Sequence, residues 1–494
     1  MIHNITTGFA VALQPVNLLF ALIGAVLGTL VGVLPGLGPT ATIAMLIPAT
    51  AGMDPLQAII MMAGVYYGSM YGGSTTSILI NTPGEAASIM TCLDGYQMTL
   101  QGRAGAALGI SAIGSFIAGT ISVAGLMFLA PVVSDVALSF GPVENFSLML
   151  LGFSVVISLA GKSILKGLLS CSVGVALGSV GLDLVYGTPR LTYGTAVLLN
   201  GIEFIAVVVG MFAIPEVLEG VEQSAGTLVR GKLRGLFPTL QDLKDSFGAI
   251  MRGSFLGFAV GLVPGGSGTV ATFLSYDLEK KVSKHPERFG KGAIEGVAGP
   301  ESANNAVTGA SMIPLLTLGI PCGAALAVLM GALMIHGLRP GPLLFTSNPS
   351  FVWGLIASMY IGNVMCLILN LPLVGLWARL TLIPFPLLGP VVLVLCFVGT
   401  YGVNNSMFDV WVMAIAGTVA YLMKKVSIPL VPMVLALVVG PNLESALRQS
   451  LAMSKGSPLI FFSHPISLAI LCLATFSVFL SFRSRAREAA DDER

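Results

Sequence analysis

Four polar side chains lie close together in the segment VAGPESANNAVTGAS, residues 297–311: Glu301, Ser302, Asn304 and Asn305. From residue 303 to residue 338 the chain then contains no Asp, Glu, Lys or Arg. Polar groups inside or beside such a stretch are costly unless they pair with each other or bind something. We therefore predict that Ser302, Asn304 and Asn305 bind substrate. A wet cytoplasmic loop is the alternative setting for Glu301, and structural capping is the alternative role of the two amides.

A second polar group lies in GGSTTSILINTPGE, residues 72–85. Within it, Ser74, Thr75, Thr76 and Asn81 are candidate substrate-binding residues, because hydroxyl and amide groups can hydrogen-bond a ligand inside a membrane. Hydrogen bonding between neighbouring helices is the alternative use of the hydroxyl groups.

Glycine- and proline-rich breaks occur in two similar segments, GAVLGTLVGVLPGLGPT (residues 24–40) and GSFLGFAVGLVPGGSGT (residues 253–269). Non-helical backbone at membrane depth has unpaired N–H and C=O groups that protein, water or ligand must satisfy. A helix that begins after each break, near Thr40 and near Thr269, directs N–H groups and its positive dipole end at an anion such as a carboxylate. Close helix packing is the alternative use of these glycines. The predicted substrate contacts are Gly36, Gly38, Thr40, Gly265, Gly266, Ser267 and Thr269.

Two further breaks, NTPGEAA (residues 81–87) and GIPCGAA (residues 319–325), also resemble each other. Pro321 of the second is assigned to substrate binding. Freed carbonyls and hydroxyl oxygens at such breaks can hold a cation such as sodium. The candidate cation contacts are Thr42, Thr82, Thr308 and Gly319. We predict no resident cofactor, and a sodium ion or a proton as the coupling ion.

These matches indicate an internal duplication. Eight residue pairs of the two glycine motifs, Gly28 and Gly257 among them, match at one common offset. The second pair of breaks matches at an offset that is nine residues larger. We predict a first membrane repeat over residues 1–225 with a hairpin at about 24–50, and a basic cytoplasmic linker over 226–252. A second repeat over 253–482 has a hairpin at about 253–279, and a charged cytoplasmic tail covers 483–494.

The composition excludes an ordinary soluble domain. Of the 494 residues, 55% are hydrophobic and 10% are charged, and the mean hydropathy is +0.91. Soluble domains carry about 25% charged residues. Uncharged runs of spanning or nearly spanning length recur, and alternating strand patterns are missing, so helices are favoured over a barrel. The sequence therefore predicts an all-α polytopic membrane protein in the lipid bilayer.

The charge distribution predicts how the hairpins enter the membrane. Ten of the 24 basic residues fall between Arg230 and Lys291, which assigns this region to the cytoplasm by the positive-inside rule. Arg252 precedes the second glycine motif and Lys280 follows it. A helix over 253–263 covers only about 16 Å, so we expect a re-entrant hairpin. The first motif, with no basic flank, is expected to enter from the opposite face. Opposed broken hairpins are typical of inverted-repeat secondary transporters.

Several of these motifs together resemble one known family. The segments GVLPGLGPTATIAMLIPAT, YGGSTTSILINTPGE, HPERFGKGAIEGVAGPESANNAVTGAS and LTLGIPCGAALAVLMGALMIHGLRPGPLLF are similar to the large membrane subunit of tripartite tricarboxylate transporters. The resemblance extends from about residue 24 to residue 441. Cys322 is a departure, because a glycine is expected after GIP, and a thiol there would narrow the site.

The resemblance implies a function. Members of this family are secondary transporters of the bacterial inner membrane. They work with a small membrane subunit and with a periplasmic solute-binding protein that delivers a small organic anion, a tri- or dicarboxylate such as citrate. An ion gradient is the implied energy source, so the chain is expected to catalyse symport.

Other functions fit the sequence less well. No GxxxxGK[ST] phosphate loop and no HExxH motif occurs, and Ser267 lacks a nucleophile-elbow context. We therefore predict no enzyme activity. The net charge of +1 gives no indication of nucleic-acid binding. An anion channel is the alternative, because the same broken helices can line a continuous pore.

Overall fold

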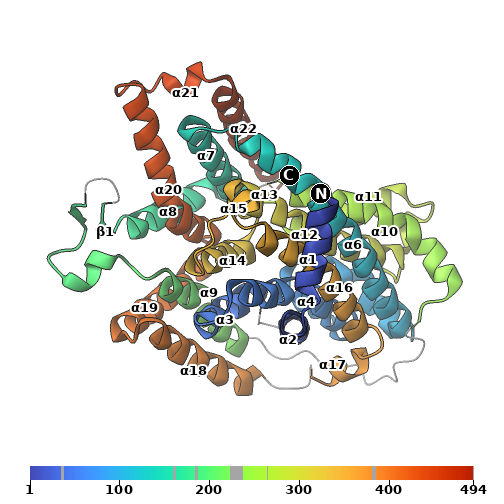
Figure 1. Ribbon diagram of the computed structural model, residues 1–494. Helices are drawn as coiled ribbons and strands as arrows, with labels where there is room; N and C mark the ends of the chain where they lie inside the picture. Colours follow the sequence, from blue (N-terminus) through green and yellow to red (C-terminus); the bar gives the residue numbers. More distant parts are fainter. Residues whose placement is uncertain are drawn as a thin grey trace.

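The computed structural model describes residues 1–34, 38–159, 163–183, 187–222, 237–263, 265–380 and 385–492, and these are almost entirely helical (Figure 1). In this described part, strands are limited to the short pair β1 (Gly181–Leu182) and β2 (Pro189–Arg190), which is antiparallel. The predicted all-α class is confirmed.

The first part of the chain, up to residue 222, forms these helices in order: α1 (Ile2–Ala12), α2 (Pro15–Val33), α3 (Pro39–Thr50), α4 (Pro55–Ile80), the 3-10 helix η1 (Ala86–Ser88), α5 (Ile89–Leu100), α6 (Ala104–Ala137), α7 (Pro142–Leu159), α8 (Ile164–Gly178), η2 (Ala196–Asn200) and α9 (Phe204–Glu222). Several helices begin at proline, whose fixed φ suits the first helical position. Asp54 caps α4, because its Oδ1 accepts a hydrogen bond from Leu56 N at 2.9 Å.

The second part forms α10 (Leu240–Gly261), α11 (Gly268–Val282), η3 (Pro286–Arg288), α12 (Glu295–Ala310), α13 (Met312–Leu318), α14 (Ala324–Ile335), α15 (Leu343–Ser347), α16 (Pro349–Asn370), α17 (Val374–Leu380), α18 (Phe385–Asn404), α19 (Met407–Lys425), α20 (Val431–Met453), α21 (Ile460–Ser463) and α22 (Pro465–Asp492). The helix that carries the second glycine motif thus begins at Leu240. The sequence placed its start at Gly253, because the basic residues before this position suggested a linker. Thr239 instead starts the helix with a capping box to Asp242.

Within the described residues, six helices are long and apolar enough to cross a membrane: Pro15–Val33, Ala104–Ala137, Phe204–Glu222, Pro349–Asn370, Met407–Lys425 and Val431–Met453. Apolar side chains are exposed along several of them, for example Trp411 on α19. In a lipid bilayer such surfaces are in contact with acyl chains. The chain is a multi-pass membrane protein.

A row of glycines allows α2 to pack directly on α4. A Cβ atom at Gly24, Gly28 or Gly32 would collide with a backbone carbonyl oxygen of α4. These oxygens belong to Met61, Val65 and Ser69. Small residues in this arrangement let two helix backbones approach closely.

The glycines of the second motif pack α10 on α12 in the same way. A Cβ at Gly253, Gly257 or Gly261 would meet the carbonyl oxygen of Gly299, Ala303 or Val307, respectively. The spacing and order of the contacts are those of the α2–α4 pair. The residues that match in sequence therefore also occupy matching positions in space.

The helix boundaries next to these pairs match as well. One common offset relates Asn81 to Gly319 and the start of η1 at Ala86 to the start of α14 at Ala324. Asn81 and Gly319 both end a helix in the left-handed conformation, with φ of 54° and 67°. This conformation reverses the chain after each helix.

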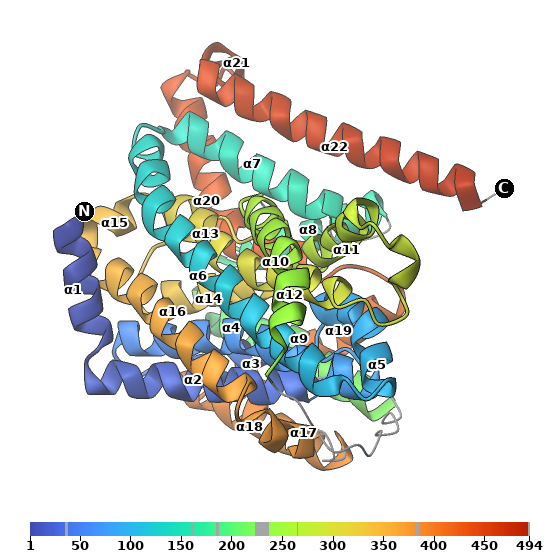
Figure 2. The ribbon, with the colours of Figure 1, turned by 90° about the vertical axis from the view of Figure 1, so that its right-hand side faces the viewer.

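The remaining helices pack around this centre (Figure 2). On one side α9 lies against α3, α18 and α19. On another, α20 lies against α7 and α8, and the long helix α22 runs beside α7. One large apolar cluster connects α2, α3, α4, α9, α14, α16 and α20. The interrupted helices are thus held inside a continuous core.

Candidate functional site

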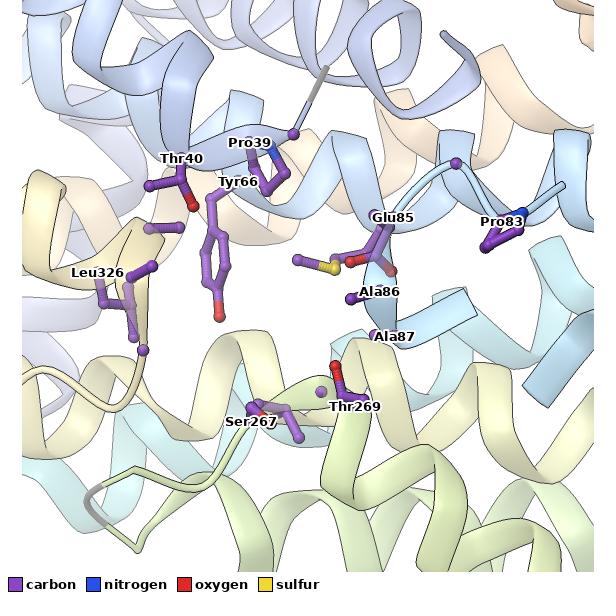
Figure 3. A pocket seen from close by; sticks show the side chains of 18 of the residues that line it. Pro39, Thr40, Tyr66, Pro83, Glu85, Ala86, Ala87, Ser267, Thr269 and Leu326 are labelled. Carbon is purple, nitrogen blue, oxygen red and sulfur yellow. The ribbon is translucent and has the colours of Figure 1, made fainter. Parts of the chain in front are cut away.

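A cavity of about 520 Å³ lies where the interrupted helices of both parts of the chain meet (Figure 3). Its walls come from segments far apart in the sequence. The lining residues are Gly38, Pro39, Thr40, Tyr66, Met70, Pro83, Gly84, Glu85, Ala86, Ala87, Glu216, Glu219, Gly220, Gly266, Ser267, Gly268, Thr269, Val307, Cys322, Gly323, Ala324, Ala325, Leu326 and Lys424.

Three helices begin at this cavity: α3 at Pro39, α11 at Gly268 and α14 at Ala324. The first N–H groups of a helix have no intrahelical partner, and the helix dipole makes this end positive. The three helix starts therefore give the cavity wall an affinity for negative charge.

The helix starts at α11 and α14 carry no acidic side chain. Ser267 precedes α11, and its Oγ accepts a hydrogen bond from Val270 N at 3.3 Å. Gly323 precedes α14 in an extended conformation and supplies no side chain. A Cβ at Gly323 would meet nothing within 4 Å. The start of α14 therefore faces open space in the cavity, whereas a Cβ at Gly268 of α11 would lie 2.5 Å from Asn304 Oδ1.

The helix start at α3 is already in contact with a carboxyl group. Glu216 of α9 accepts a hydrogen bond from Gly38 N at 3.1 Å. Glu219, one turn further along α9, pairs with Lys424 of α19 at 2.8 Å. Both carboxyl groups and the Lys424 side chain belong to the cavity wall.

A third carboxyl group, Glu85, lies in the break between α4 and η1. Its Oε1 accepts a hydrogen bond from Asn304 Nδ2 at 2.8 Å. Its own N–H donates to Ser88 Oγ at 3.4 Å. Because Asn304 belongs to α12, this hydrogen bond connects the two parts of the chain at the cavity wall.

The side chain of Tyr66 projects into the cavity (Figure 3). Figure 3 shows its ring projecting from α4 between Thr40 and Ser267, with Glu85 further along the same wall. The Tyr66 hydroxyl lies 3.4 Å from Ser311 Oγ. The ring supplies an apolar surface and the hydroxyl a polar end, a combination suited to a small ligand with both kinds of group.

Of the residues predicted to bind substrate, five line the cavity: Gly38, Thr40, Gly266, Ser267 and Thr269. Gly265 precedes them, with a φ of 79° that glycine adopts readily. Pro321 lies in the break between α13 and α14, next to the lining residue Cys322. Gly36 lies outside the described residues.

The predicted hydroxyls of α4 are buried behind the cavity wall. Ser74 Oγ donates to Glu301 Oε2 at 2.5 Å, and Thr76 Oγ1 donates to the Gly73 carbonyl at 3.2 Å. Thr75 is 2% exposed and lies between them. Asn81, at the end of α4, is exposed and does not line the cavity.

The polar residues of α12 are also buried rather than open to the cavity. Asn304 contacts the cavity wall through its hydrogen bond to Glu85. Asn305 Nδ2 donates to Ser115 Oγ at 2.7 Å. Ser302 Oγ and the Oδ1 atoms of both asparagines have no hydrogen-bond partner among the described residues.

The hydrogen bonds of the candidate cation contacts are local and do not bring these residues together at one point. Thr42 and Thr82 each donate to a nearby backbone carbonyl, that of Gly38 at 3.1 Å and that of Ile80 at 3.3 Å. Thr308 donates to the Asn305 carbonyl at 2.6 Å. Gly319 ends α13. Among the described residues, no group of three or more His, Cys, Asp or Glu side chains is placed to hold a metal ion.

Sequence reasoning missed the charged part of the wall, Glu85, Glu216, Glu219 and Lys424. A signal existed for Glu85, because it follows the break NTPG directly and is the charged residue closest to it. The other three lie on long apolar helices, α9 and α19, far from any glycine motif. Only the packing of α9 on α3 and of α19 on α9 brings them to the cavity.

A polytopic helical protein with a polar cavity between interrupted helices has the architecture of a membrane transporter. The family model described as the tripartite tricarboxylate transporter TctA family matches residues 18–435, and the chain belongs to this family. The resemblance read from the motifs is thereby confirmed. The chain is the large membrane subunit of a tripartite system, which includes partner subunits.

Two relatives come from Agrobacterium vitis. One is an uncharacterized 52.8 kDa protein in the TAR-I ttuC' 3' region, 45% identical over 492 residues, which cover 99% of this chain and 98% of the relative. The other is an uncharacterized protein in the TAR-II ttuC' 3' region, 44% identical over 235 residues, which cover 48% of this chain and 97% of the relative. No solved structure matches the chain.

Proposed function

We propose that this subunit is a secondary active transporter that imports a small organic anion, a tri- or dicarboxylate such as citrate, through the described cavity. A periplasmic solute-binding protein delivers the anion, and a small membrane subunit completes the complex in the bacterial inner membrane. Membership of the family supports this assignment.

The single observation that carries the proposal is the meeting of three helix N-termini at one cavity. Those of α11 and α14 have no carboxyl group on them, so a substrate carboxylate can accept hydrogen bonds from the N–H groups around Gly268 and Ala324. Each such charge-assisted hydrogen bond contributes about 1.5–3 kcal/mol. Two separate positive ends suit a substrate with more than one carboxylate.

The charge of the wall supports coupling to a cation. Glu85, Glu216 and Glu219 face the cavity, and Lys424 is the basic residue among its lining residues. When all four are ionised, the wall is negative and repels an anion. A dicarboxylate therefore enters more favourably together with protons or metal cations, which is the linkage that a symporter uses.

The matching packing of α2 on α4 and of α10 on α12 supports a mechanism of alternating access. We infer that the two halves are inverted repeats related by a pseudo-twofold axis in the membrane plane. One bundle then rocks or slides against the other, and the cavity opens to each side in turn.

The test is uptake of labelled citrate and other di- and tricarboxylates by vesicles that hold the membrane subunits, with the binding protein added. Gly323→Asp adds a carboxylate at the start of α14, where the structure leaves room for it. We expect this variant to lose at least about tenfold in uptake, because about 1.4 kcal/mol of repulsion already costs that factor. Gly323→Ala is the matched control and should retain uptake.

The same vesicles separate a carrier from an anion channel. A carrier gives flux that saturates, requires the binding protein and follows an imposed sodium or proton gradient. Ohmic current without the binding protein, or equal uptake by Gly323→Asp and Gly323→Ala, would contradict the proposal.

A further inference from the structure

A fully buried carboxyl group, Glu301, lies between the two parts of the chain and outside the cavity. Its exposed fraction is 0%. Glu301 belongs to α12, and its partners come from three helices of the first part. Ser74 of α4 donates to Oε2 at 2.5 Å, Thr91 of α5 donates to Oε1, and the Ser111 hydroxyl of α6 lies close to the same carboxyl group.

All three partners of the Glu301 side chain are hydroxyl groups. Among the described residues, no Lys, Arg or His side chain forms an ion pair with Glu301. An ionised carboxylate buried without a positive partner costs several kcal/mol, and such a group is more stable in its neutral form. A neutral carboxylic acid donates one hydrogen bond and accepts others, so in the neutral form the Ser74 or the Thr91 hydroxyl accepts from the carboxyl group instead of donating to it.

Asp94, a second buried carboxyl group, has a different set of hydrogen-bond partners. Its Oδ1 accepts from the backbone N–H groups of Gly290, Gly292 and Ala293 at 2.8–2.9 Å, and its Oδ2 accepts from the Tyr276 hydroxyl at 2.8 Å. Asp94 is also 0% exposed. Glu301 has none of these N–H donors. The two carboxyl groups are equally buried but have different hydrogen-bond partners.

A metal ion does not fit between Glu301 and its partners. The Ser74 hydroxyl is 2.5 Å from Oε2, a direct hydrogen-bond distance. An ion coordinated by both oxygens would hold them further apart, since each metal–oxygen bond to a hard cation is about 2.0–2.6 Å long. A proton is the cation that this geometry accommodates.

The other ionisable groups around Glu301 leave it without a counter-charge. Cys92 on α5 and Glu85 in the break after α4 are titratable groups near Glu301, and neither carries a positive charge. On α10 and α11, Arg252 is engaged with Glu279 at 2.9 and 2.5 Å, and Tyr276 with Asp94. At the start of α6, Arg103 pairs with Asp242 at 2.5 Å. The remaining titratable side chains on α4 and α12 are neutral or acidic: Tyr66, Tyr67, Tyr71 and Glu295.

We propose that Glu301 is a proton-binding site at the contact between the two halves, protonated in this conformation, and that it releases its proton to water when the halves separate. The carboxylic acid becomes a carboxylate, and the proton passes to the side on which the contact opens. Coupling of this proton to substrate rests on the proposed function. Asn304 follows Glu301 by one turn of α12 and donates to Glu85 at the cavity, so a movement of α12 changes both positions together.

The sign of the pH effect follows from this arrangement. Because the neutral form of Glu301 is compatible with the closed contact, protonation stabilises this conformation, and a rise in pH favours separation of the halves. A proton bound on one side and released on the other gives the stoichiometric coupling of a symporter.

Infrared difference spectroscopy of the purified protein tests the site without any transport assay. In the native protein we expect a C=O stretching band of a buried carboxylic acid, which Glu301→Gln removes. Gln keeps the shape and donates a hydrogen bond, so the variant should fold and elute as the native protein does. The matched control is Glu287→Gln in exposed η3, which should leave the band unchanged. A native spectrum without a band that depends on Glu301 overturns the proposal.

Transport measurements test the coupling. Glu301→Gln mimics the permanently protonated state, so we expect loss of accumulation driven by a pH gradient, while exchange of labelled for unlabelled substrate is retained. Accumulation that still responds to the pH gradient in Glu301→Gln would refute the coupling role. If the native complex shows neither exchange nor accumulation of any carboxylate, the proposed function fails, whereas the infrared band still decides whether Glu301 binds a proton.

Discussion

The two interrupted regions of this transporter have similar helix ends and similar helix packing, but their side chains differ in charge. In the first part, the start of α3 contacts the Glu216 carboxyl group, and the break after α4 carries Glu85. In the second part, Ser267 precedes α11 and Gly323 precedes α14 at the equivalent positions, and neither residue is charged. The repeated backbone produces the cavity, and the unequal side chains give it two chemically different walls.

This difference suggests a division of tasks between the two halves. A wall whose helix N-termini carry no carboxyl group suits an anionic substrate, and a wall with carboxyl groups suits the cations that accompany it. A duplicated chain with identical side chains would give two equal sites. Substitutions can test whether the two backbones are equivalent in packing and whether the two sets of side chains differ in function.

The largest effect is expected for the glycines that allow the helices to touch. Gly28→Val and Gly257→Val each place a side chain against a backbone carbonyl oxygen, which forces α2 from α4 or α10 from α12. Overpacking of this kind costs about 1–3 kcal/mol or more, so we expect little folded protein in the membrane for either variant. The measurement is the amount of monodisperse protein after detergent extraction.

Gly440→Val in α20 is the matched control, because a Cβ there would meet nothing within 4 Å. It should be produced at the native level. Loss of folded protein for only one of the two glycine variants would show that the two helix pairs are not equivalent.

A smaller but clear loss of stability is expected for Asp94→Ala. The substitution leaves the N–H groups of Gly290, Gly292 and Ala293 without their buried acceptor, at a cost of about 1–3 kcal/mol for each group left unsatisfied. We expect a lower midpoint in thermal unfolding of the purified protein.

Tyr276→Phe provides the comparison for Asp94→Ala. It removes one of the four hydrogen bonds to Asp94 and should lower the midpoint less. Equal effects of the two substitutions would argue against the backbone N–H groups as the main stabilising contacts.

The next effect is on transport and distinguishes two neighbouring amides. Asn304→Ala removes the hydrogen bond to Glu85 at the cavity wall, worth about 0.5–1.5 kcal/mol or more for a charged partner. We expect uptake to fall about threefold or more. Asn305→Ala removes the bond to Ser115 behind the wall and should reduce uptake less, with a greater part of its effect on stability.

Asn348→Ala is the control for both amides, because Asn348 is exposed between α15 and α16 and its side chain makes no capping hydrogen bond. Its uptake should equal that of the native protein. Native uptake by both the Asn304 and Asn305 variants, at equal membrane abundance, would remove these amides from the transport mechanism.

The smallest effect on folding is expected for Lys424→Gln. Lys424 and Glu219 are each about one third exposed, and exposed pairs contribute about 1 kcal/mol or less. Uptake should nevertheless fall and become less sensitive to salt, because the variant removes the positive charge that lines the cavity. Initial rates at low and high ionic strength measure this, and an unchanged salt dependence would place Lys424 outside the substrate path.

The sequence by itself determined the class of the protein and the positions of its interruptions. Low charge content and long apolar runs require membrane helices. Proline and glycine set the ends of helices locally, so the starts of α3 and α11 were predicted near Thr40 and Thr269 and lie at Pro39 and Gly268. The start of α10 was missed, because a charged amphipathic helix before Gly253 resembles a linker when only its basic residues are considered.

Only the tertiary structure decided which side chains face the cavity. Glu216 and Lys424 reach it because α9 packs on α3 and α19 packs on α9, and no local pattern specifies these contacts between distant segments. Conversely, Ser74 of α4 and Asn305 of α12 are polar enough to bind substrate, yet close helix packing turns Ser74 toward Glu301 and Asn305 toward Ser115 of α6. Local sequence fixes where a helix breaks, because φ and hydrogen bonding are local. Which face of that helix meets a ligand depends on contacts made across hundreds of residues.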